Sequence, residues 1–218
     1  VLPNGEAIQT GLAGFAGAKA GPVYRWGVGP SLDGLFSQSN LGIVTGMTIW
    51  LMPAPERFRA FFFQSNREGG LAEIVDALRP LRLDGTLRSS VHIGNDYKVV
   101  AGIRQFPWEE STPLTPDRLK HHCQQLKVGR WSGSGGLYGS RKQVKEAVRL
   151  VRRALAGKVD KLQFLDDRLL SIASRFTGAY RLVTGLDLSR TLELVRPVYG
   201  LLKGIPTSQS LGSAYWRK

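Results

Sequence analysis

Strand-like and helix-like segments alternate after residue 57, and this order restricts the fold to a mixed architecture. The run FRAFFFQ, residues 58–64, is typical of a buried strand, and apolar residues from Leu71 onward recur at helical spacing. Further strand-like and helix-like segments follow in turn, at 89–93, 115–126, 131–138, 141–156 and 159–165. This order predicts an α+β domain with helices on one face of a mainly antiparallel sheet, of the ferredoxin-like type.

Residues that start and stop helices sharpen these boundaries. Ser140 and Gln143 have the spacing of a capping box, and Gly157 is a typical terminator, so a helix is expected over 141–156. Pro80 is expected to end the helix that begins at Leu71, and Pro197 to interrupt a helix near the C-terminus. Residues 94–113 have the composition of a loop, and the glycines of GRWSGSGGLYG predict a strand that a neighbour approaches closely.

Charge divides the chain into two parts. Residues 1–56 carry 2 basic and 3 acidic side chains, whereas residues 57–218 carry 28 and 14. Because the prolines at 53 and 55 lie at this change, a domain boundary is expected between 56 and 57. The chain starts without Met in a hairpin-like turn, Pro3-Asn4-Gly5, so we expect it to be a fragment of a longer protein.

The segment DGLFSQSNLGIVT, residues 33–45, leads into an alternating run, IVTGMTIWLM, that predicts a strand over 43–52. A glycine-rich turn that delivers main-chain amides to the edge of a sheet suits the phosphates of a dinucleotide. The same composition also serves a tight turn without a ligand. The residues alone leave these two interpretations open.

The longer stretch GVGPSLDGLFSQSNLGIVTGMTIWLMPAPE, residues 27–56, resembles the end of the flavin-binding domain in the vanillyl-alcohol oxidase and p-cresol methylhydroxylase family of FAD enzymes. The similarity continues in the family's order with RPLRLDG at 79–85, LKVGRW at 126–131, GGLYG at 135–139 and KGIPT at 203–207. The resemblance implies that residues 1–56 are the C-terminal part of a PCMH-type FAD-binding domain. Residues 57–218 would then be part of the cap domain that shapes the substrate pocket.

The resemblance also implies a set of cofactor contacts. Residues of the family's SNxGIV stretch and a glycine before it are expected to lie along FAD: Gly34, Ser39, Asn40, Gly42, Ile43 and Val44. Asp33 stands in the same motif, and its role stays open between cofactor contact and turn formation. No catalytic residue and no metal ligand is assigned to this chain.

The implied reaction belongs to the longer protein. Family members oxidise para-substituted phenols by hydride transfer from the benzylic carbon to flavin, through a quinone methide, and pass the electrons to oxygen or a cytochrome. The covalent flavin attachment and the residues that bind the phenolate are expected beyond Lys218, and the pyrophosphate loop before Val1. The fragment alone is therefore expected to be inactive and to bind FAD poorly. The exact substrate, the electron acceptor, the flavin linkage, the localisation and the oligomeric state, including a homo-oligomer, stay open.

Other classes of function are weighed beside this one. No segment has 18 consecutive apolar residues, so a membrane span is not expected. His121, His122 and Cys123 are adjacent on a helix and point about 100° apart, which does not favour chelation of one metal ion. The net charge of +13 and the cations of 141–156 keep open a nucleic-acid binder and a docking face for an acidic partner. A binding or scaffold protein that retains the cap fold is the remaining alternative.

Overall fold

The computed structural model describes residues 1–24, 26–27, 29–106, 114–175 and 188–208, without the side chains of 173–174 and 188–194. Two compact units are present, Val1–Ala54 and Pro55–Lys218. Among the helices that the structure describes, none has the length and apolar character needed to cross a membrane.

The N-terminal unit consists of turns and two short 3-10 helices, η1 (Gly11–Gly14) and η2 (Asp33–Phe36). The expected turn at Asn4 and Gly5 is present, because the Gly5 amide donates to the Leu2 carbonyl at 2.9 Å. The expected strand over 43–52 is not formed within the described chain. An alternating pattern gives only a preference for extended backbone, and a strand needs a ladder of hydrogen bonds to a neighbour. Among the described residues, the main chain of this segment pairs only at Ile43, with Val1.

The second unit is built on a four-stranded antiparallel sheet in the order β2-β3-β1-β4. The long central strands are β1 (Arg57–Ser65) and β3 (Trp131–Gly139), and the edge strands are β2 (His92–Asn95) and β4 (Lys161–Leu165). Helix α1 (Leu71–Leu83) connects β1 to β2, and α4 (Arg141–Leu155) connects β3 to β4. Two interleaved β-α-β units therefore form the sheet, which confirms the α+β architecture.

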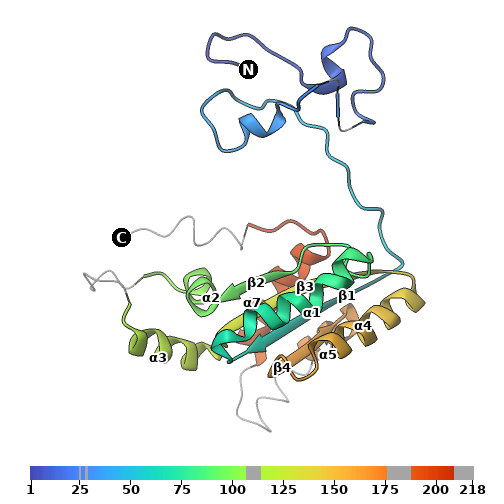
Figure 1. The fold of residues 1–218 in the computed structure, drawn as a ribbon. Coiled ribbons are helices and arrows are strands. Elements are labelled where there is room, and N and C mark those ends of the chain that lie inside the picture. The colour runs from blue at the N-terminus through green and yellow to red at the C-terminus, as the bar shows by residue number, and fades with distance from the viewer. Residues whose placement is uncertain (25, 28, 107–113, 176–187, 209–218) are drawn as a thin grey trace. The chain divides into compact units, whose positions relative to one another are not determined.

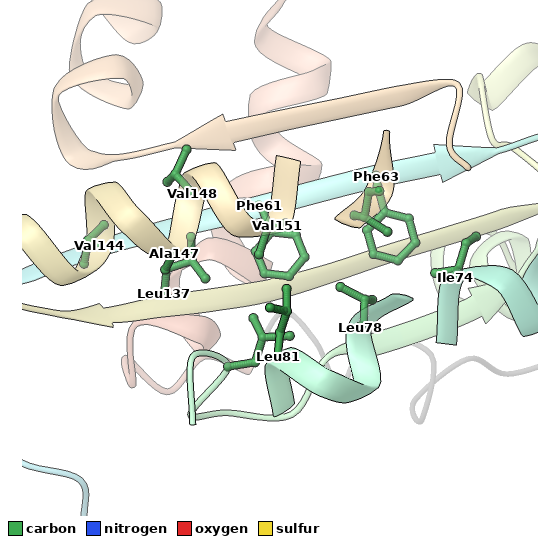
Figure 2. Close-up of a cluster of buried hydrophobic side chains, with 12 residues drawn as sticks. Phe61, Phe63, Ile74, Leu78, Leu81, Leu137, Val144, Ala147, Val148 and Val151 are labelled. Atoms are coloured by element: carbon green, nitrogen blue, oxygen red, sulfur yellow. The ribbon is translucent and has the colours of Figure 1, made fainter. Parts of the chain in front are cut away.

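One face of the sheet carries the main hydrophobic core (Figure 2). Helices α1 and α4 lie across this face (Figure 1), and their apolar stripes meet the aromatic rings of β1. The buried cluster consists of Phe61, Phe63, Ile74, Leu78, Leu81, Leu87, Leu137, Val144, Ala147, Val148, Val151 and Leu155. Because these residues come from both helices and both central strands, they fix the two helices on the sheet.

The opposite face is also contacted by a helix, so the expectation of helices on one face only is wrong. Helix α7 (Leu188–Leu202) reaches β1 through Tyr199, whose ring packs edge-on against Phe58 at a centroid distance of 5.2 Å. The Tyr138 hydroxyl on β3 donates to the carbonyl of Leu202. Phe58 and Phe61 are three residues apart on one strand, so they point to opposite faces.

The glycines of β3 admit the aromatic rings of β1, as the sequence predicts. Gly133 lies directly opposite Phe63, and Gly135 lies opposite Phe61. A Cβ at Gly133 would lie 2.2 Å from the nearest atom of the Phe63 ring, and one at Gly135 would lie 2.6 Å from the Phe61 ring. The rings therefore occupy the space that side chains at these positions would need.

Three helix boundaries differ from the expectations. Pro80 and Pro197 lie inside α1 and α7 and end neither helix. Residues Asp96–Ile103 form α2, although this stretch has the composition of a loop. The Asn95 side chain caps α2 by accepting a hydrogen bond from the Lys98 amide at 2.9 Å, which is a signal the sequence carries.

The remaining helices of the second unit agree with or add to the expected order. Helix α3 (Pro116–Leu126) begins directly after Thr115, as predicted. Helix α4 begins with the full capping box of Ser140 and Gln143. The 3-10 helix η3 (Glu68–Gly70) precedes α1, and α5 (Asp167–Arg175) follows β4.

Candidate functional site

The segment of the N-terminal unit expected to contact a cofactor forms an exposed loop after η2. The Ser39 hydroxyl donates to the Leu35 carbonyl at 2.5 Å and accepts from the Leu41 amide at 3.3 Å. Gln38 has a left-handed backbone with φ of 52°. Ser39 therefore maintains the shape of the loop, and the turn that precedes it is tight.

Gly42 has a packing reason for lacking a side chain. A Cβ at this position would lie 2.8 Å from the Val1 carbonyl oxygen and 3.1 Å from the Phe36 ring. The adjacent Ile43 exchanges two main-chain hydrogen bonds with Val1, at 2.7 and 2.8 Å. Val1 and Phe36 of the chain itself therefore occupy the space beside Gly42.

The other expected contact residues are accessible on this loop. Ile43 is 72% exposed and Val44 is 52% exposed, and Asn40 and Gly34 are exposed as well. No atom lies within 4 Å of the position that a Cβ would take at Gly34. Within the described part of the chain, the main-chain amide of Val44 has no recorded hydrogen-bond partner. The loop therefore presents two aliphatic side chains and open backbone to solvent.

In the second unit, an open cleft of about 770 Å³ lies between α3, the start of α2 and one end of the sheet. Asp96 is buried at its wall and accepts from Arg130 Nη1 at 2.6 Å. The hydrogen bond from Arg130 and the charge of Asp96 raise the pKa of the arginine. This ion pair connects the N-terminus of α2 to the segment before β3. No local sequence pattern indicates it, because the partners are 34 residues apart.

Cys123 and His122 of α3 have contacts and charges within the second unit that shift their pKa values. Among the described residues, no group of three His, Cys, Asp or Glu side chains could hold a metal ion. Burial raises the pKa of the Cys123 thiol, and burial with the Arg104 charge lowers the pKa of His122. The His122 ring lies 3.0 Å from Arg104 Nη1, so its contact connects α3 to the end of α2.

Comparison with known proteins finds relatives that match the whole chain. This chain is 42% identical to 1'-carboxy-chondrochloren decarboxylase of Chondromyces crocatus and covers 41% of that protein. It is 31% identical to the flavoprotein subunit of 4-cresol dehydrogenase (hydroxylating) of Pseudomonas putida and covers 38% of it. No family model matches the chain.

Solved structures show the same relationship. The structure of p-cresol methylhydroxylase with substrate bound matches 100% of this chain with a TM-score of 0.68 at 28% identity. The isoeugenol complex of 4-ethylphenol oxidase from Gulosibacter chungangensis matches 98% with a TM-score of 0.70 at 27% identity. The chain is homologous to the FAD-linked oxidases of the vanillyl-alcohol oxidase and p-cresol methylhydroxylase family. It spans about two fifths of the length of these flavoenzymes.

Two of the segments that carry the resemblance to the flavoenzyme family lie at the ends of helices. In RPLRLDG, Gly85 adopts φ of 80° and the Thr86 amide donates to Asp84 Oδ1 at 2.8 Å. Hydrogen bonds from the main chain and the side chain of Thr86 lower the pKa of Asp84. In LKVGRW, Lys127 ends α3 in a left-handed conformation with φ of 54°. These motifs therefore have structural roles in this part of the flavoenzyme fold.

Lys203, in the segment KGIPT, belongs to a polar cluster that no local sequence pattern indicates. Lys203 Nζ donates to both oxygens of Asp167, at 2.8 and 2.9 Å, and the Tyr199 hydroxyl donates to Asp167 at 2.9 Å. The lysine hydrogen bond is the main cause that lowers the pKa of Asp167, and burial is the main cause that raises the pKa of Tyr199. The cluster holds the start of α5 to the end of α7.

Proposed function

We propose that this chain is part of an FAD-dependent oxidoreductase that oxidises para-substituted phenols. Residues 1–56 are the C-terminal part of its PCMH-type FAD-binding domain, and residues 57–218 are part of its ferredoxin-like cap. The observation that carries the proposal is the match over the whole chain, in sequence and in fold, to two enzymes whose names give a cresol and an ethylphenol as substrates. FAD, when bound, supplies the hydride acceptor.

The residues of this chain that we propose contact FAD lie on the exposed loop. Gly34, Ser39, Asn40, Gly42, Ile43 and Val44 would lie along the cofactor, with main-chain groups toward its polar parts. Ile43 and Val44 would cover an apolar face, which agrees with their exposed side chains. Ser39 would position the loop rather than transfer a proton, because its hydroxyl is committed to Leu35 and Leu41.

The cap would shield the reaction site from solvent, and its packed sheet suits this role. The two central strands and two helices share one core, so the cap can hold a pocket wall in a fixed position. Oxygen or a cytochrome would accept the electrons, as in the family.

The experiment uses the longer protein that contains these residues. It should be purified with yellow flavin absorbance, and a para-alkylphenol should bleach this absorbance without oxygen. Asn40→Asp, which places a negative charge at the expected cofactor contact, should lower the flavin content per protein. Asn4→Asp is the matched control, since it makes the same change at an exposed turn of the same unit. A colourless protein would favour the scaffold alternative, and equal flavin content in both variants would reject the loop as a contact.

A second candidate function is decarboxylation, which the 42% identity to a decarboxylase favours. The same flavin-containing preparation should be incubated with a para-alkylphenol and with a carboxylated analogue. Release of carbon dioxide from the analogue would support the decarboxylase. Flavin reduction by the alkylphenol, with no release of carbon dioxide, would support the oxidase or dehydrogenase.

A further inference from the structure

Six cations occupy one side of α4. At 100° per residue, their positions fall within an arc of about 120°, and from first to last they span about 18 Å along the helix axis. We call this set the α4 stripe: Arg141, Lys142, Lys145, Arg149, Arg152 and Arg153. All six residues are exposed.

The core fixes the direction in which the α4 stripe faces. The residues on the other side of the helix are buried between the sheet and α1: Val144, Ala147, Val148, Val151 and Leu155. Rotation of the helix would expose this apolar surface, so the cations are held toward solvent. The full capping box at Ser140 also fixes the first turn.

Some side chains of the α4 stripe are restrained by neighbouring residues. An open surface hollow of about 510 Å³ lies among side chains of this one helix: Lys142, Lys145, Glu146, Val148, Arg149 and Arg152. Arg149 binds Glu146 through two hydrogen bonds, at 2.9 and 2.5 Å. The Arg152 guanidinium lies over the Phe164 ring, 5.4 Å from its centroid. These restraints reduce the side-chain entropy that a partner would have to remove on binding.

We propose that the α4 stripe is a docking surface for an acidic surface of another protein. A row of carboxylates about 18 Å long would pair with the cations. A symmetric contact with a second copy would place the stripe against itself, which like charges oppose. A nucleic-acid backbone would meet the half-exposed carboxylate of Glu146 at one edge of the stripe, whereas a protein partner can offer it a donor.

The test measures binding of the 218-residue chain to a labelled poly-L-glutamate peptide long enough to span about 18 Å, by fluorescence anisotropy at low salt. The stripe variant is Lys142→Gln, Lys145→Gln and Arg153→Gln, since glutamine is a good helix former. The control variant is Arg88→Gln, Lys98→Gln and Lys120→Gln, at exposed positions elsewhere in the same unit. Both variants lose the same charge, so a difference between them reports the location of binding.

The stripe variant should bind the peptide about tenfold more weakly, and the control variant less than about threefold more weakly. Circular dichroism should show the same fold and thermal midpoint in both. Equal losses in the two variants would overturn the proposal, because binding would then follow total charge. Tighter binding of a duplex RNA of the same length, lost in the stripe variant, would assign the surface to nucleic acid instead.

Discussion

Replacing Gly133 with alanine should destabilise the second unit because the new methyl group has no room. The Cβ would lie 2.2 Å from the terminal ring carbon of Phe63 and less than 3 Å from two further ring atoms. Gly133 is paired to Phe63 on one side and to Ile93 on the other, so the backbone cannot move away. The Phe63 ring is 1% exposed and is stacked near Phe61, so it cannot swing into solvent.

The size of the effect follows from this overlap. Overpacking a rigid core costs about 1–3 kcal/mol, and the overlap at Gly133 favours the upper end, about 2–3 kcal/mol. For a domain of this size each kcal/mol lowers the melting temperature by about 2–4 °C. Thermal and urea unfolding followed by circular dichroism should therefore show a fall of about 5–10 °C in Tm with an unchanged m-value.

Two further variants test the reasoning. Gly102→Ala, in α2 where no atom lies within 4 Å of the new Cβ, should be neutral or stabilising by up to about 1 kcal/mol. Phe63→Leu should relieve the overlap, so the double variant with Gly133→Ala should be more stable than the sum of the single effects by about 1 kcal/mol. Additive effects, or a Gly133→Ala variant as stable as the parent, would refute the steric argument.

Three other changes have expected outcomes. Ser140→Ala should lower the unfolding free energy by about 1 kcal/mol in urea titrations, because it removes the N-cap of α4. Asp96→Ala should cost about 2 kcal/mol in the same assay, less than for a fully buried pair because Arg130 is 34% exposed. The pKa of Asp167 is lowered from 3.8, chiefly by its hydrogen bond from Lys203, so its stabilisation is present above pH 3.8 and lost as the pH falls through the folded value. Asp167→Asn should therefore lower Tm at pH 7, and this effect should shrink as the pH falls below 3.8 and through the folded pKa; a constant difference across pH would contradict the assignment.

The sequence predicts local features well where neighbouring residues decide them. The capping box of α4 and its apolar stripe are both present in the structure, because 3.6-residue spacing and a cap act within one helix. The buried strand at 58–64 is present as β1, because a run of aromatic and apolar residues needs a core. The glycines of β3 signal a close neighbour without identifying it.

Tertiary packing reverses other local preferences. Pro80 removes a hydrogen bond from α1, yet Leu78 and Leu81 on either side of it are buried in the core, and this burial maintains the helix. The alternating pattern of 43–52 does not become a strand, because among the described residues its main chain pairs only at Ile43, with Val1, and no ladder follows. A local pattern states what a segment can form, and its neighbours decide whether it forms.

The sequence by itself determined the family resemblance, the α+β order of segments and the cationic side of α4, since each is written in consecutive or periodic residues. Only the tertiary structure decided the strand order β2-β3-β1-β4, the helix on the second face and the pairs Asp96–Arg130 and Asp167–Lys203. These features join residues tens of positions apart. Their formation depends on loop closure and on the packing of the whole core, and no local stretch of sequence encodes either.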